Sequence, residues 1–116
     1  MRERHWFKDG HGRCIGSEQD GKYYDQHGRF LGQRGSGGFY TNSRGRCIGR
    51  DMRDSYTDSR GKYLGRHKDG KYYDHHGRQT GSLSGGSYRD SHGRTTGYYS
   101  RGGGKVFGIF KRFFGR

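Results

Sequence analysis

Aromatic, polar and glycine positions form one phrase that recurs six times along the chain. Each copy has an aromatic residue, one variable position, Asp (once Asn), two polar residues, Gly, Arg or Lys, two variable positions and a second Gly. The first glycines of the six phrases are Gly12, Gly28, Gly45, Gly61, Gly77 and Gly93, so the spacing is 16 residues with a single 17. A period this regular indicates one small structural unit used six times.

The residues within each phrase predict a β-hairpin. Asp at the first position and Gly at the fourth are typical of a type I turn, and a glycine with positive φ completes a three-residue hairpin connection. In the second phrase this register pairs Tyr24 with Phe30 and Tyr23 with Leu31. Because residues two apart share a face of a strand, Tyr23 and Leu31 are expected on one face and Tyr24 and Phe30 on the other.

The other phrases fit the same register. Asp25 faces Arg29 across the turn, and the same pairing of acid and base recurs in every unit except the third, where Asn42 faces Arg46. The position predicted to face the aromatic is aliphatic in four units and Thr in the last two; these residues are Ile15, Leu31, Ile48, Leu64, Thr80 and Thr96. Tight-turn dipeptides join most units; the five connections are Asp20-Gly21, Gly37-Gly38, Arg53-Asp54, Asp69-Gly70 and Gly85-Gly86.

The predicted fold class is therefore all-β, an antiparallel meander of about a dozen short strands in six hairpin repeats of about 16 residues. A lone hairpin is not stable in water, so the units must share their apolar stripe. Two architectures remain open, a stacked β-solenoid and a closed ring resembling a flower or small propeller. We expect a repeat domain over residues 1–101, followed by a Gly linker and a short amphipathic segment over 102–116.

Composition alone favours a different interpretation. Leu, Ile, Val and Phe together make up 14 of 116 residues, the net charge is +13, and the chain has 25 Gly and no Pro. Such values are typical of a disordered Arg/Gly-rich chain, which stays an alternative. The fixed placement of Asp, Gly and Tyr favours an ordered array, because disorder requires only a composition, and the ten Tyr residues are good strand formers.

Several short motifs resemble known repeats. Tyr24-Asp25-Gln26-His27-Gly28-Arg29 resembles the YD repeat of RHS-type proteins, which build β-hairpin shells, and Asp20-Gly21-Lys22-Tyr23-Tyr24 is similar to the opening of choline- and glucan-binding repeats. Over residues 5–97 the chain resembles small bacterial and phage proteins of the β-flower type, made of short Tyr-x-Asp-x-x-Gly-Arg units. These resemblances imply a hairpin fold and carry no activity with them.

Basic residues mark every predicted hairpin tip. Arg or Lys follows the turn glycine, and His or Arg precedes it; the twelve candidate polyanion-binding residues are Arg13, Arg29, Arg46, Lys62, Arg78, Arg94, His11, His27, Arg44, Arg60, His76 and His92. A regular positive stripe with aromatic residues nearby suits a phosphate backbone. The simpler interpretation is that each Arg serves only its Asp partner, but 24 basic residues face 11 acidic ones.

The C-terminal segment has a different pattern. Over residues 105–116, apolar and basic residues separate onto opposite sides of a helix. Its apolar side is expected to cap the repeat array or to form an interface with a partner or a second copy; the candidate residues are Phe107, Ile109, Phe110, Phe113 and Phe114. Contact with a membrane surface is a further possibility for such a basic amphipathic pattern.

Other chemistry has little support in the sequence. Cys14 and Cys47 occupy equivalent slots and lack metal-ligand spacing, so no metal site and no cofactor are expected, and whether the two thiols pair is open. Glu is rare, the Asp residues are used in turns, and no catalytic motif occurs, so we expect no enzyme. No secretory signal or apolar span is visible, which predicts a cytoplasmic protein.

The sequence thus favours a non-enzymatic protein that binds nucleic acid or another polyanion through its hairpin tips. The alternative is a structural or protein-interaction module of the phage or mobile-element type, which oligomerises or inhibits a partner through its aromatic face and C-terminal segment.

Overall fold

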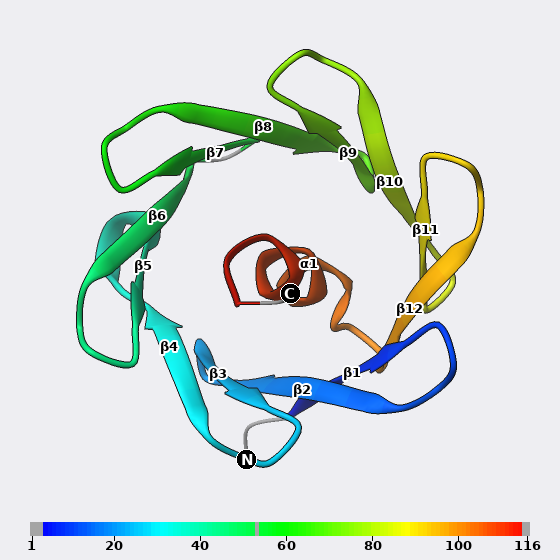
Figure 1. The fold of residues 1–116 in the computed structure, drawn as a ribbon, viewed down its shortest axis with the longest axis horizontal. Helices are drawn as coiled ribbons and strands as arrows, with labels where there is room; N and C mark the ends of the chain where they lie inside the picture. The colour runs from blue at the N-terminus through cyan, green and yellow to red at the C-terminus, as the bar shows by residue number, and fades with distance from the viewer. Residues whose placement is uncertain (1–3, 53, 115–116) are drawn as a thin grey trace.

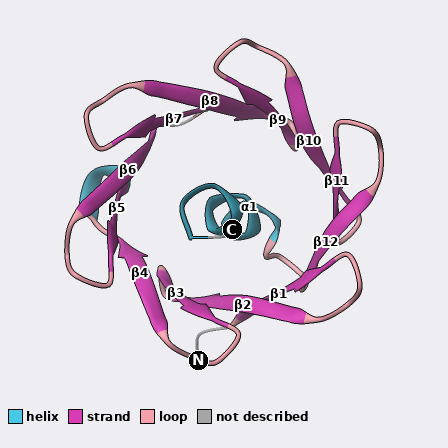
Figure 2. Ribbon diagram, viewed as in Figure 1, coloured by secondary structure: helices cyan, strands magenta, loops and turns pink. Residues whose placement is uncertain are grey.

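A computed structural model describes residues 4–52 and 54–114 and shows a closed ring of antiparallel strands (Figures 1 and 2). The strands are β1 (His5–Asp9), β2 (Cys14–Gln19), β3 (Lys22–Asp25), β4 (Phe30–Arg34), β5 (Phe39–Asn42), β6 (Cys47–Met52), β7 (Ser55–Asp58), β8 (Tyr63–Lys68), β9 (Lys71–Asp74), β10 (Gln79–Ser84), β11 (Ser87–Asp90) and β12 (Thr95–Tyr99). A single 3₁₀ turn, η1 (Ser36–Gly38), joins β4 to β5.

Each predicted unit is one hairpin, and every strand pairs with its neighbours in the chain. The ring closes because β1 also pairs with β12, with Phe7 opposite Tyr99 and Asp9 opposite Gly97. The prediction of an all-β hairpin array is confirmed, and closure selects the ring over the open solenoid. The ring measures about 35 × 34 × 25 Å.

The hairpin tips have the predicted turn. In the second unit the Gly28 N–H donates to the Asp25 carbonyl oxygen, and the Asp25 N–H donates to the Arg29 carbonyl oxygen. The first glycine of every phrase has φ between +81° and +85°, a region that other residues rarely adopt. Most connections between units are equally tight: Asp20 and Gly21 both have positive φ, as the type I′ turn requires. In the third connection, Arg53 lies outside the described residues.

The predicted register beyond the tip is wrong by one residue. Tyr24 does face Phe30, but Tyr23 pairs with Gly32 instead of Leu31, because a β-bulge lies between the two pairs. Leu31 is the extra residue of the bulge, and equivalent bulges interrupt all six hairpins. The second glycine of each phrase, and not the aliphatic residue, therefore faces the core aromatic.

One aromatic residue per unit points into the ring. These residues are Phe7, Tyr23, Tyr40, Tyr56, Tyr72 and Tyr88, and all except the last are buried. The aliphatic bulge residues Ile15, Leu31, Ile48 and Leu64 pack against this cluster and are partly buried. The units thus share one interior, as the instability of a lone hairpin requires.

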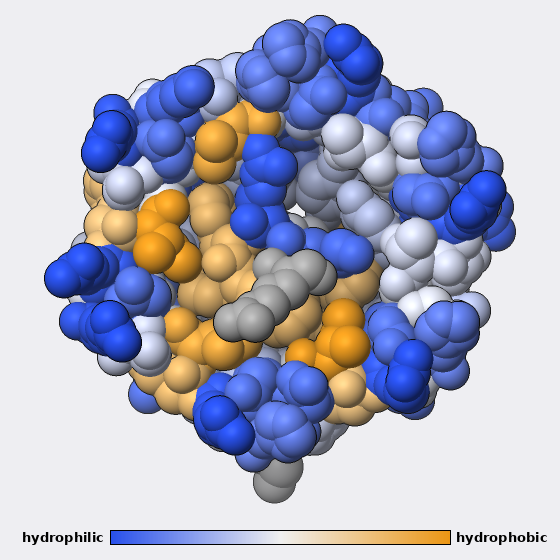
Figure 3. Space-filling view, in the orientation of Figure 1, coloured by the Kyte–Doolittle hydropathy of each residue, from blue (hydrophilic) through white to orange (hydrophobic). Residues whose placement is uncertain are grey.

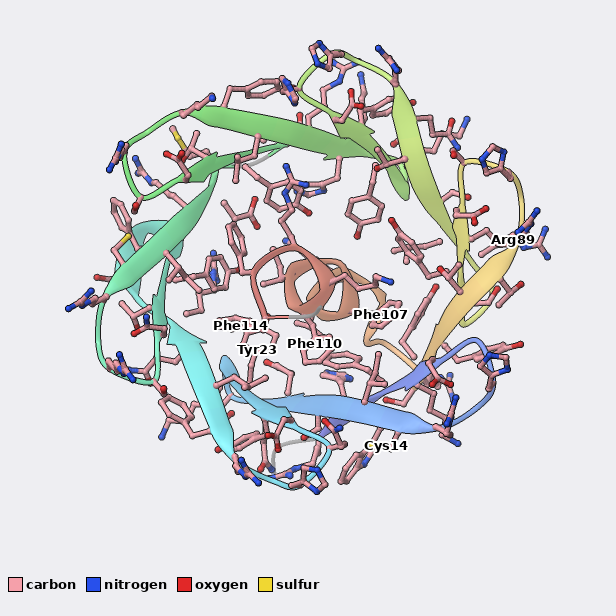
Figure 4. All side chains as sticks on the ribbon, in the orientation of Figure 1. Cys14, Tyr23, Arg89, Phe107, Phe110 and Phe114 are labelled. Atoms are coloured by element: carbon pink, nitrogen blue, oxygen red, sulfur yellow. The ribbon has the colours of Figure 1, made fainter. Side chains whose placement is uncertain are left out.

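The C-terminal segment occupies the middle of the ring (Figure 4). It forms helix α1 (Gly104–Ile109), followed directly by a π-helical turn, η2 (Phe110–Phe114). Its phenylalanines stack on the inner aromatics: Phe110 lies 4.8 Å from Phe7, and Phe114 lies 4.7 Å from Tyr23, between ring centroids. The segment supplies the centre of a core that the ring alone leaves open.

The second glycines leave the space that this segment fills. A Cβ added at Gly16 would lie 2.5 Å from the ring of Phe110, and one at Gly97 would lie 2.6 Å from Phe107. A Cβ added at Gly32 would likewise lie too close to the ring of Phe114, and one at Gly49 too close to the ring of Phe113. At these four positions the second glycine is explained by close packing between the inner wall and the tail, whereas a Cβ at Gly65 or Gly81 would meet atoms of the neighbouring strand.

Candidate polyanion-binding surface

The twelve basic residues predicted at the tips lie on the rim of the ring, and all of their side chains are exposed. The six tips point outward around the perimeter, where Figure 3 shows hydrophilic groups separated by narrower paler zones. The closed ring brings these residues into one circular array around the molecule, but it does not gather them into a pocket.

The tip carboxylates are engaged by the backbone. Asp25 Oδ1 accepts the N–H of His27 at 2.8 Å and that of Arg29 at 2.9 Å. All six tips repeat this pair of hydrogen bonds, with distances between 2.8 and 3.1 Å. Asn42 makes the same two bonds with its side-chain oxygen, which explains why Asn can replace Asp there.

These bonds shape the electrostatics of the tips. The backbone N–H of Arg29 is the largest cause that lowers the pKa of Asp25, and the other four tip aspartates have lowered pKa values for the same reason. Among the described residues, Arg13 is the one tip cation with a carboxylate within 4.0 Å, its Nε lying 3.4 Å from Asp9 Oδ2. The guanidinium and ammonium groups of the other units extend into solvent without a carboxylate partner.

The five residues predicted as an interface or cap lie within the ring. Phe107, Ile109 and Phe110 are buried, while Phe113 and Phe114 are partly buried. The aromatic side of the tail is therefore covered by the protein's own inner wall. In this arrangement it is not presented to a partner protein or to a membrane.

Two basic residues of the tail line a small cavity inside the ring. The cavity has a volume of about 210 Å³ and is bounded by Lys111, Arg112 and the inner tyrosines of the fourth to sixth units. The Lys111 Nζ lies 5.3 Å from the ring centroid of Tyr88, and burial lowers the pKa of Lys111. Burial also raises the pKa of the inner tyrosines, that of Tyr40 to about 12, so these phenols stay neutral at physiological pH.

Among the described residues, two buried carboxylates of the inner wall each lie near a histidine ring. His67 Nε2 lies 3.4 Å from Asp51 Oδ1, and His5 Nε2 lies 4.0 Å from Glu18 Oε1. Glu18 also accepts the N–H of Gly21 at 2.9 Å. These contacts connect the strands of the inner wall to one another and to a connecting turn.

The remaining candidate chemistry is sparse in the part of the chain that the structure describes. Cys14 and Cys47 are exposed free thiols on the outside of the ring. Within residues 4–52 and 54–114, no group of three or more His, Cys, Asp or Glu side chains could hold a metal ion. None of the described helices has the length and apolar character needed to cross a bilayer.

Searches of protein-family models, curated proteins and solved structures found no match to this chain. The geometry of the molecule is therefore the basis for assigning a function.

The candidate polyanion-binding residues predicted from the sequence all lie at the tips, and the prediction missed basic residues on the outer wall of the ring. Arg50, Arg66 and Arg89 lie in strand interiors, one position away from inward-pointing residues. Strand alternation extended beyond the repeated phrase would have found them.

Proposed function

We propose that the protein binds nucleic acid or another polyanion, with the tip Arg, Lys and His side chains contacting phosphate or sulfate groups. The observation that carries the proposal is the exposed circular array of twelve basic or protonatable tip residues, in which the adjacent carboxylates are engaged by backbone N–H groups. A net charge of +13 adds long-range attraction for polyanions.

The tips are suited to this role because their backbone is rigid. Each basic side chain is attached within one residue of the turn glycine, and the surrounding turn is held by four hydrogen bonds. The cations therefore project at fixed intervals around the rim, which lowers the entropic cost of meeting a chain of regularly spaced anions.

The test is a salt titration of binding, measured by fluorescence anisotropy with labelled duplex DNA. For contacts to phosphates, the logarithm of the association constant falls linearly with the logarithm of salt concentration. The double variant Arg29→Gln/Arg78→Gln is expected to reduce the slope by about 0.9 for each phosphate contact that is lost.

The matched control is Arg101→Gln/Lys105→Gln, which removes the same charge from exposed positions outside the tips. If both double variants weaken binding equally, net charge is responsible and the tips are not the site. If the wild type binds no polyanion at low salt, the proposed function is wrong.

A further inference from the structure

The outer wall of the ring is formed by the side chains that alternate with the buried core residues. Directly paired residues of adjacent strands point to the same face, so the wall can be followed as rows that cross four or five strands each. The six rows are Trp6, Ser17, Tyr24 and Phe30; Gln19, Lys22, Gln33, Thr41 and Cys47; Phe39, Arg50, Thr57 and Tyr63; Met52, Ser55, Arg66, Tyr73 and Gln79; Lys68, Lys71, Ser82, Arg89 and Thr95; and Ser84, Ser87, Tyr98, Lys8 and Cys14.

The charge of these rows is of one sign. None of the residues in them is Asp or Glu, and five of the six rows contain Lys or Arg. The row that begins at Trp6 has no cation of its own, but Arg4 lies over it, 5.4 Å from the ring of Trp6 and 4.9 Å from that of Tyr24. Figure 4 shows Arg89 directed away from the ring on this outer side. The acidic residues of the strands lie instead at the tips or on the inner wall, as Asp51 does.

The same wall exposes aromatic rings. Trp6, Phe30, Phe39, Tyr63 and Tyr98 are each between 39% and 47% exposed. By contrast, the inner aromatics Phe7, Tyr23, Tyr40, Tyr56 and Tyr72 are each at most 9% exposed.

Cations and rings on the wall are in contact. The guanidinium of Arg50 lies 4.6 Å from the centroid of Phe39, and that of Arg66 lies 5.1 Å from the centroid of Tyr73. The six rows thus combine flat apolar faces with positive charge, and none of their residues carries a carboxylate.

We propose that the outer wall selects single-stranded nucleic acid, whose bases stack on the exposed rings while its phosphates meet the wall cations and the tips. This inference rests on the polyanion binding proposed above and specifies its substrate class. A single strand offers unstacked base faces, which sequence-tolerant binding sites hold on aromatic side chains. A duplex keeps its base faces stacked, and a sulfated polysaccharide has no aromatic faces, so neither uses the rings.

The test compares three labelled probes at the same salt concentration: oligo(dT) of thirty nucleotides, a duplex of the same length, and heparin. The wall variant is Phe39→Thr/Tyr98→Thr, in which a strand-forming residue replaces two exposed rings without changing the charge. The matched control is Met52→Thr, which removes an apolar side chain of similar exposure (46%) that has no aromatic face. Thermal unfolding of each variant checks that the ring is intact.

The expected result is that the wall variant loses about fivefold or more in oligo(dT) affinity for each ring that contacts a base, with an unchanged salt slope. Its affinity for heparin and for duplex stays at the wild-type value, and the Met52→Thr variant binds all three probes normally. Equal loss for all probes, or no loss for oligo(dT), overturns the inference while leaving tip-mediated polyanion binding in place. Absence of binding to every probe overturns both proposals.

Discussion

We expect the side chain of Phe107 to stabilise the closed form of the ring. Its side chain is fully buried and packs against Phe7 of β1, Tyr88 of β11 and Tyr99 of β12, with centroid distances of 5.3, 5.7 and 5.8 Å. It also fills the space left by Gly97. These contacts lie on both sides of the junction where β1 pairs with β12.

The perturbation is Phe107→Ala. Truncating a buried Phe costs about 3–5 kcal/mol, because both the transfer energy and the contacts of the surrounding residues are lost. This is a large share of the roughly 5–15 kcal/mol by which a domain of this size is stable. With an unfolding entropy of about 2.1 cal/mol/K for each of the 116 residues, the melting temperature is expected to fall by about 12–20 °C.

The assay is thermal unfolding followed by near-ultraviolet circular dichroism, which reports on the packing of the inner aromatics. The control is Lys105→Ala, an exposed residue of the same helix, for which we expect a change within about 0.5 kcal/mol. Amide exchange of β1 and β12 measures whether the junction opens first. If the Phe107→Ala variant has the same melting temperature as the wild type, the tail is not part of the folded core and the reasoning fails.

Two further predictions concern the repeated phrase. The Gly49→Ala variant is expected to lose stability in denaturant titration, because its Cβ would lie 2.8 Å from the Thr57 carbonyl oxygen and against Phe113. The control Gly35→Ala is expected to unfold like the wild type, because the nearest neighbour of its added Cβ lies at 3.7 Å. Equal unfolding midpoints for the two variants would contradict the packing argument. Because folding lowers the pKa of Asp25, its ionised form stabilises the fold above the unfolded value near 3.9, and this contribution is lost as the pH falls through the lower folded value. Asp25→Asn keeps the acceptor oxygen without the titration, so its melting temperature should lie below that of the wild type at neutral pH and approach it in acid, and a pH-independent difference would refute this linkage.

The tips and the repeat were predictable because the information that determines them is local. Asp25 and Gly28 specify their turn through hydrogen bonds and a backbone angle that involve only neighbouring residues. The register beyond the tip was not predictable in the same way. Leu31 is a better strand residue than Gly32, but the position facing Tyr23 must admit the ring of Phe114, a residue far away in the sequence.

Closure of the ring also depends on distant residues. The junction between β1 and β12 joins the two ends of the repeat domain, and identical units permit either a closed ring or an open array. Helical periodicity revealed the apolar side of the tail but not the surface that it covers, because that surface exists only after the ring has formed. The basic residues at the tips of the candidate surface could be predicted from the repeated phrase. Those on the outer wall could be predicted only by following the alternation of side chains along the strands of all six units.

One departure from exact repetition, at the fifth unit, matches the orientation of the tail. A six-unit ring is nearly symmetric, but the tail is not: Phe110, Phe113 and Phe114 pack against the inner aromatics of the first four units, as Phe113 does at 5.0 Å from Tyr40. Those four units have Ile or Leu at the bulge position, and two of these residues, Ile15 and Leu31, border a cavity together with tail phenylalanines. The fifth unit has Thr80 there, which lines a different cavity, bounded by the inner tyrosines of the fourth to sixth units together with Lys111 and Arg112. The change from aliphatic to Thr in the fifth unit thus coincides with a part of the inner wall whose cavity is not lined by the tail phenylalanines that border the cavity at Ile15 and Leu31.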